Sequence, residues 1–252
     1  MPINSPKISI LSHTLNGDTI DIPADKLIHL RCTGQHPMIW IFPNNNYPLF
    51  EHNEQFNNIK VRSDCDRQVK QSARKCWTEV IIPEAKYDMT GSYVCLYNQS
   101  NIRSSSMINY HPISIESTDQ VMSSSSIVGS VESSNVMDSI YIYVNDPHNL
   151  MVPFEGQVGF LFIALFQQQP ATIPCRPTYS KAVVKLWKTN SKENGSPEEI
   201  KPNSTLGITY DSKKGFYFEN ARWDTESNSL QCHFEIDGLS STASISIHWS
   251  SR

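Results

Sequence analysis

The sequence lacks the motifs by which most enzymes and metalloproteins are recognised. It has no His-Glu-x-x-His, no Gly-x-Ser-x-Gly, no phosphate-binding glycine-rich loop and no kinase signature. None of its six cysteines forms Cys-x-x-Cys, and no histidine stands at zinc-finger spacing from a cysteine. The eight histidines are scattered and form no assignable Ser/His/Asp set. We therefore expect a protein that binds rather than catalyses, without a cofactor or a metal ion.

Strong net charge and long apolar runs are missing as well. A net charge of −4 over 252 residues gives no reason to expect a nucleic-acid partner. The longest apolar run, residues 160–166, is too short to cross a membrane, and the first residues do not form a signal segment. The even number of cysteines is typical of disulfides formed in an oxidising compartment. We expect a piece of the extracellular part of a larger protein.

The stretch Asp88-Met-Thr-Gly-Ser-Tyr93-Val-Cys95 organises the first half of the chain. Asp and Gly favour a tight turn, and a Tyr two residues before a Cys can donate a hydrogen bond back to that turn. Cys32 lies about sixty residues upstream, and Trp40 follows it where a third strand would place an indole against the bridge. The pattern predicts an immunoglobulin-type β-sandwich closed by a Cys32–Cys95 disulfide.

The other two cysteines of this half, Cys65 and Cys76, are left for each other and would close a polar hairpin at the edge of the sandwich. The loop between them is basic. It is either a solvated loop or a contact for a partner such as heparan sulfate. Its cations are Arg67, Lys70, Arg74 and Lys75.

A serine-rich segment follows Cys95, and residues 111–139 contain no aromatic side chain. Such a composition cannot build a core, so we expect residues 100–139 to be mobile. The segment is either a linker after a last strand at 107–110, or an insertion before a last strand at 140–144. We favour the insertion, because residues 140–144 have the clearer β pattern.

The second half repeats the theme with changes. Cys175 and Cys232 are again about sixty residues apart and are expected to pair, and Trp187 stands at the distance of the third strand. Leu230 replaces the corner tyrosine, and Pro174 removes a ladder donor, which predicts a bulge or a partly unpaired edge. A hairpin is expected over residues 208–218 and a last strand over residues 244–249.

Residues 160–166 (Phe-Leu-Phe-Ile-Ala-Leu-Phe) should form an edge strand, because they precede the strand that carries Cys175. Alternation places the phenylalanines on one face, and Leu161, Ile163 and Leu165 on the other. An edge strand of a sandwich buries only one face. We therefore expect an apolar set that is partly exposed and marks an interface, unless a neighbouring domain or loop covers it.

The second half contains four characteristic blocks, at residues 140–147, 173–176, 183–186 and 210–216. In order and spacing they resemble the second immunoglobulin domain of the platelet-derived and vascular endothelial growth factor receptors, over most of this half. The serine-rich insertion and the Cys65/Cys76 pair depart from the vertebrate receptors, which suggests an invertebrate member. The resemblance implies an all-β chain of two tandem immunoglobulin-like sandwiches, residues 1–144 and 145–252.

The resemblance further implies part of the extracellular region of a single-pass receptor tyrosine kinase. Such a receptor binds a dimeric cystine-knot growth factor and dimerises upon binding. A homophilic adhesion molecule and a secreted growth-factor decoy are the alternatives. Carried over by position, the ligand-binding residues would be Phe154, Val158, Phe160, Phe162 and Trp223.

Three Asn-x-Ser/Thr sequons, at Asn98, Asn194 and Asn203, predict a glycoprotein. Glycans at Asn194 and Asn203 would shield one edge of the second domain. A protein ligand should therefore approach from the side of residues 160–166.

Overall fold

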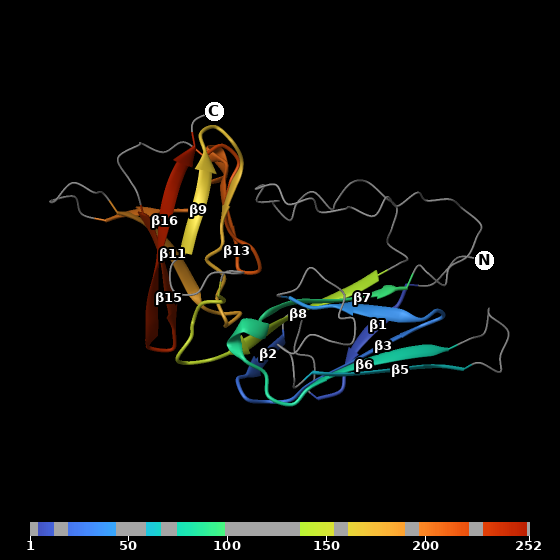
Figure 1. Cartoon of the computed structure of the whole chain (residues 1–252). Helices are drawn as coiled ribbons and strands as arrows, with labels where there is room; N and C mark the ends of the chain where they lie inside the picture. Colours follow the sequence, from blue (N-terminus) through green and yellow to red (C-terminus); the bar gives the residue numbers. More distant parts are fainter. Residues whose placement is uncertain are drawn as a thin grey trace.

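The computed structural model describes residues 5–12, 20–43, 59–66, 75–98, 137–153, 161–189, 197–221 and 229–250, with only the backbone described at 161, 162, 249 and 250. The predicted all-β architecture is confirmed: the strands form two sandwiches, joined end to end (Figure 1). Each sandwich has its own cluster of buried apolar side chains, one from residues 20–144 and one from residues 150–247.

The first sandwich consists of two four-stranded sheets. One has the order β1-β3-β6-β5, and the other has the order β2-β8-β7-β4. Neighbouring strands are antiparallel except β2 and β8, which run parallel. The strands are β1 (Lys7–Ile10), β2 (Ile20–Pro23), β3 (Ile28–Gly34), β4 (Met38–Ile41), β5 (Lys60–Cys65), β6 (Cys76–Ile82), β7 (Gly91–Tyr97) and β8 (Met137–Asn145).

The corner before β7 forms as the sequence predicts. A short 3-10 helix, η3 (Tyr87–Met89), makes the turn, and the buried Tyr93 hydroxyl donates to the Met89 carbonyl at 3.0 Å. Gly91 has φ 151°, and a Cβ there would lie 2.4 Å from the Pro43 Cβ, so the position excludes a side chain.

The core of this sandwich is centred on the Cys32–Cys95 disulfide. Trp40 on β4 stands directly opposite Cys95 on β7 and is 3 % exposed, as the spacing predicts. Cys65 and Cys76 stand opposite each other on β5 and β6 and form a second disulfide at the sheet edge. Both bridges join the predicted partners.

Strand β8 decides between the two alternatives for the end of this sandwich. It pairs with β7 on one side and with β2 on the other, so residues 140–144 belong to its last strand, as favoured above. The predicted mobile segment ends too late, because Met137, Asp138 and Ser139 already pair with β7. Residues 99–136, including the alternative strand at 107–110, lie outside the described residues.

The second sandwich combines a five-stranded sheet, β12-β11-β15-β16-β9, with a three-stranded sheet, β10-β14-β13. The Cys175–Cys232 disulfide joins its two layers. A 3-10 turn, η6 (Ser204–Leu206), precedes β13. The strands are β9 (Leu161–Phe166), β10 (Ala171–Ile173), β11 (Val183–Thr189), β12 (Glu198–Ile200), β13 (Ile208–Asp211), β14 (Gly215–Phe218), β15 (Ser229–Ile236) and β16 (Leu239–Ser250).

Trp187 does not occupy the position that its spacing suggests. Leu186 stands opposite Cys232 and is fully buried, so Leu186 takes the place that Trp40 has in the first sandwich. Trp187 is one residue later and therefore lies on the outer face of β11, partly exposed. The expectation that it packs against the disulfide is wrong by one residue.

Pro174 breaks its strand, as predicted. β10 ends at Ile173, and two tight turns follow, with Cys175 N donating to the Ile173 carbonyl and Arg176 N to the Pro174 carbonyl, both at 2.8 Å. Gly215 (φ 105°) packs against this kink, where a Cβ would lie 2.1 Å from the Ile173 oxygen.

Candidate ligand-binding surface

β9 is the edge strand that the sequence predicts, and it pairs in parallel with β16. Ile163 and Leu165 are buried in the core, whereas Phe166, on the opposite face, is 40 % exposed. The side chain of Phe162 lies outside the described part of the structure. One face of the strand is thus committed to the core, and its other face offers an apolar edge.

The end of β9 is held beside the segment that leads to Trp223. Gln168, in a left-handed conformation with φ 60°, donates its backbone N–H to the Ala221 carbonyl at 2.9 Å. Ala221 N donates in return to the Gln169 carbonyl at 3.0 Å, and Ala221 is fully buried. The turn after β9 is therefore bonded to Ala221, the last described residue before Trp223.

Most of the predicted binding residues lie outside the described ranges. Phe154, Val158, Phe160 and Trp223 fall in the gaps at 154–160 and 222–228, and Phe162 is described only by its backbone in β9. Their role in binding stays a prediction. Phe166, on the apolar face by alternation, is exposed in the structure, although it is not among the binding residues that the resemblance implies.

The stretch of chain around Phe166 is apolar or neutral. Residues 161–173 contain no charged side chain, and three glutamines follow Phe166. An exposed aromatic ring among neutral polar groups can bury apolar area without desolvating a charge. This arrangement suits recognition of a protein surface.

On the outer face of the five-stranded sheet, the central strands β11 and β15 are largely polar, and β11 carries Trp187 opposite Gln231. Beside it, the His233 ring contacts Thr242 at 3.0 Å and Glu235 at 2.9 Å, and Lys185 Nζ lies 3.3 Å from the Glu235 carboxylate. Hydrogen bonds from His233 and Lys185 lower the pKa of Glu235. Sequence reasoning missed Trp187 as a surface residue, because it had assigned the indole to the core.

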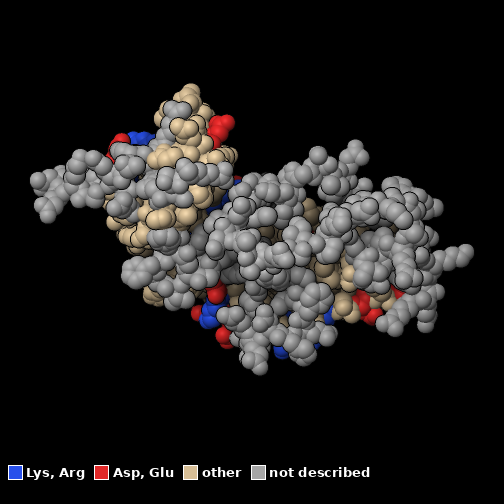
Figure 2. Space-filling view, turned by 45° about the horizontal axis from the view of Figure 1, so that its top comes forward, with Lys and Arg blue, Asp and Glu red and all other residues tan. Residues whose placement is uncertain are grey.

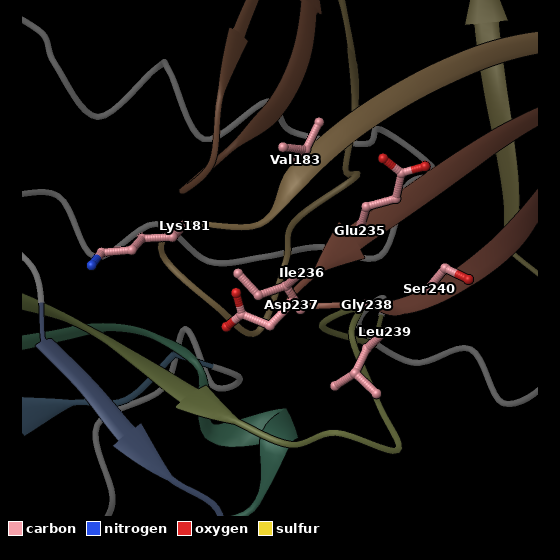
Figure 3. A pocket seen from close by; sticks show the side chains of 8 residues that line it. All are labelled: Lys181, Val183, Glu235, Ile236, Asp237, Gly238, Leu239 and Ser240. Carbon is pink, nitrogen blue, oxygen red and sulfur yellow. The ribbon is translucent and has the colours of Figure 1, made fainter.

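A shallow groove lies at the tip of the β15–β16 hairpin, at the end of β16 opposite to Phe166 (Figure 3). The exposed side chains of Val183 and Leu239 give it an apolar part. Lys181, Glu235 and Asp237 give it charges of both signs. On the face drawn in Figure 2, the Lys/Arg and Asp/Glu atoms of the described residues likewise occur in small mixed groups.

The three sequons differ in their surroundings. Asn203 is exposed at the start of η6, where its Oδ1 accepts from Thr205 N at 3.0 Å and from the Thr205 hydroxyl. Asn98 is partly buried, and its backbone N donates to the Pro37 carbonyl at 2.8 Å. Asn194 lies in the undescribed segment 190–196. Glycan attachment stays a prediction at all three positions.

The described residues offer neither a metal site nor a membrane-spanning helix. No three His, Cys, Asp or Glu side chains come together there in a way that could hold a metal ion. Within the same residues, no helix is long and apolar enough to span a membrane. The described residues build two immunoglobulin-type sandwiches.

No family model matches the chain. Over 189 residues, 74% of the chain, it is 26% identical to the platelet-derived growth factor receptor alpha of Xenopus laevis, and it spans 12% of that receptor's length.

Among solved structures, the eight N-terminal immunoglobulin domains of the Down syndrome cell adhesion molecule match 98% of the chain and 24% of that protein's resolved chain, with a TM-score of 0.47 and 11% identity. The titin tandem A164-A165 matches 100% of both chains, with a TM-score of 0.35 and 10% identity. Strand order and disulfides define the fold independently of these matches. With this fold, the sequence similarity supports an immunoglobulin-domain region of a receptor that resembles the platelet-derived growth factor receptors.

Proposed function

We propose that the chain is the ligand-binding region of a cell-surface receptor tyrosine kinase, and that its second sandwich binds a dimeric cystine-knot growth factor of the platelet-derived or vascular endothelial type. The sequence similarity to a growth factor receptor over 74% of the chain is the observation that carries this proposal. A dimeric ligand offers two equivalent surfaces. Binding of one chain to each surface would bring two receptors together.

The geometry supports the end of β9 as the contact surface. Phe166 is exposed there, and the Gln168–Ala221 hydrogen bonds bring the segment before Trp223 alongside it. Aromatic side chains in a neutral surrounding are typical anchors of protein interfaces. The predicted anchors Phe154, Val158, Phe160 and Phe162 precede Phe166 along the same stretch of chain.

The experiment compares two aromatic residues of equal exposure in the second sandwich. Phe166 on β9 and Tyr217 on β14 are each 40 % exposed, but they lie on different sheets. Platelet-derived-type and vascular-endothelial-type dimers are passed over the immobilised chain, and affinities are measured by surface plasmon resonance. Phe166→Asp should weaken binding by about 2 kcal/mol or more, roughly thirtyfold, as for an interface hot spot. Tyr217→Asp should leave the affinity within about twofold of the parent value.

Far-UV circular dichroism and thermal unfolding establish that both variants are folded. Equal affinities for Phe166→Asp, Phe160→Asp and the parent chain would remove β9 from the interface. Failure of every dimer of both types to bind the parent chain would contradict the proposed function as a whole.

A heparan sulfate contact at the loop of residues 67–75 is part of the same proposal. Lys75, the last cation of the loop, is exposed just before β6. Lys60 and Arg62, exposed on β5, add to the positive charge of the loop, while Asp64 and Asp66 reduce it. Replacing Arg67, Lys70 and Arg74 by Ala should lower the salt concentration that elutes the chain from immobilised heparin. An unchanged elution point would exclude the contact.

A further inference from the structure

Two tyrosines of the first sandwich are buried although they lie on the face of their strand that points away from the core. Ile142 and Val144 of β8 point into the core, so Tyr141 and Tyr143 project from the outer face of the sheet. An outer face ordinarily meets water, yet Tyr141 is 7% exposed and Tyr143 is fully buried.

The β13–β14 turn of the second sandwich contacts these rings. The Tyr143 hydroxyl and the Ser212 hydroxyl are 2.7 Å apart, and the Lys213 ammonium lies 5.6 Å from the centre of the Tyr141 ring. The second distance is within the range of a cation–π contact. The turn itself is rigid, because Asp211 accepts from Lys213 N through its side chain and from Lys214 N through its carbonyl, both at 2.9 Å.

A second contact joins β2 to the loop before β11. The Asp21 carboxylate accepts from Ser180 N at 3.0 Å and from the Ser180 hydroxyl. In the amide orientation that satisfies its neighbours, Asn145 donates to the same carboxylate at 3.0 Å and to the Thr178 carbonyl at 2.8 Å. Asp21 and Asn145 thus bind to two residues of the second sandwich.

The connection between the sandwiches leaves little freedom. β8 ends at Asn145, whose carbonyl accepts from Ala24 N at 2.9 Å, and Leu150 is already in the second core. Of the four residues between them, Asp146 accepts at 2.8 Å from both His148 N and the Asn149 side chain. The Asn149 carbonyl accepts from the Thr178 hydroxyl at 2.8 Å. Each end of this short connection is therefore bonded to one of the sandwiches.

We propose that the Asp21–Ser180 and Tyr143–Ser212 contacts form an interdomain latch that fixes the two sandwiches as one rigid elbow. Domains in tandem ordinarily move relative to each other unless their interface is extensive. Here the short, hydrogen-bonded connection restricts bending between the two sandwiches. The two contacts, which lie on different strands, restrict rotation of one sandwich relative to the other. In Figure 1 the strands of the first sandwich run across the view while β9 and β16 run up it, so the latch holds a bend.

Residual dipolar couplings of the complete chain test the latch. In a rigid elbow, amide couplings from both sandwiches fit one alignment tensor. The triple variant Asp21→Ala, Tyr143→Phe and Ser212→Ala should lose this shared tensor, with the two sandwiches aligning to different extents.

Two matched controls separate the latch from general surface effects. Asp25 pairs with Lys86 inside the first sandwich, and Tyr217 is an exposed tyrosine of the second, so Asp25→Ala and Tyr217→Phe should keep the shared tensor. If the triple variant loses its dispersed amide spectrum, Asp21→Ala with Ser212→Ala replaces it, because these two changes break both contacts and leave the buried Tyr143 in place.

Two results would overturn the proposal. One is a parent chain whose sandwiches already align differently. The other is a folded latch variant that retains the single tensor of the parent.

Discussion

The two sandwiches share a disulfide between their layers but support it with different residues. In the first, Trp40 packs opposite Cys95 and the Tyr93 hydroxyl anchors the corner at Met89. In the second, Leu186 and Leu230 occupy the corresponding positions, both fully buried. A disulfide between the layers and alternating apolar residues in the strands are therefore common to both sandwiches, whereas the tryptophan and tyrosine around the disulfide occur only in the first.

Because of this difference, side chains that support the disulfide in the first sandwich have no such role in the second. Trp187 moves to the surface, and no tyrosine two residues before Cys232 ties the preceding segment to its own turn. That preceding segment, residues 222–228, contains Trp223 and follows Ala221, which is bonded to the turn after β9. The sandwich with fewer internal supports is the one to which we assign the ligand.

The largest effect should come from comparing the two tryptophans. Trp40→Ala removes a buried indole and should lower the free energy of unfolding of the first sandwich by about 3–5 kcal/mol. Trp187→Ala, on the outer face of β11, should change the second by less than about 1 kcal/mol. Urea unfolding followed by circular dichroism measures both. Similar losses of unfolding free energy in the two variants would show that both indoles are buried, which would contradict the placement of Trp187 on the outer face of β11.

The Cys65–Cys76 bridge offers a second comparison of the two sandwiches, because among the described residues only the first sandwich has a second disulfide. Changing both cysteines to Ser should cost the first sandwich about 2–3 kcal/mol, because the closed loop is short. The second sandwich should be unaffected, as judged from its own unfolding transition. A loss in both transitions would mean that the sandwiches unfold as a unit.

The corner tyrosine should make the first sandwich sensitive to alkali. Burial, with a smaller effect of the Asp88 carboxylate, raises the pKa of Tyr93 far above its usual value. A raised pKa in the folded state stabilises the protein fully below the unfolded pKa of about 10 and progressively less as the pH rises toward the folded pKa. Each such tyrosine should reduce the free energy of unfolding by up to about 1.4 kcal/mol per pH unit in that window.

Urea unfolding at pH 9, 10 and 11 measures this slope. Tyr141 and Tyr210 contribute in the same direction, since burial raises the pKa of both. Tyr93→Phe should remove one tyrosine's share of the slope, while Tyr217→Phe, an exposed control, should leave it as it is. An unchanged slope in Tyr93→Phe would show that the hydroxyl is not buried at the corner.

Much of the fold followed from short-range patterns. The Tyr93-x-Cys95 spacing predicts a corner that forms through local hydrogen bonds, and alternation correctly assigns Ile163 and Leu165 to the core. Trp187 was misplaced because a shift of one residue turns a strand side chain to the opposite face, and cysteine spacing does not fix the register that closely.

Less of the candidate site than of the fold could be predicted from the sequence. Phe166 could be placed on a face of its strand, but its exposure depends on the neighbouring β16 and the turn at Gln168. The latch joins Asp21 to Ser180 and Tyr143 to Ser212, pairs of polar residues that lie far apart in sequence. No local pattern marks such pairs, because they meet only after both sandwiches have formed.

The most direct measurement of the central claim is a calorimetric titration of the parent chain into a growth factor dimer of the platelet-derived or vascular endothelial type. We predict saturation at two chains per dimer. The affinity should change only modestly with added salt, because the surface near Phe166 carries no charged residue from 161 to 173. Absence of binding to dimers of both types, or an affinity that falls steeply with salt, would contradict the account.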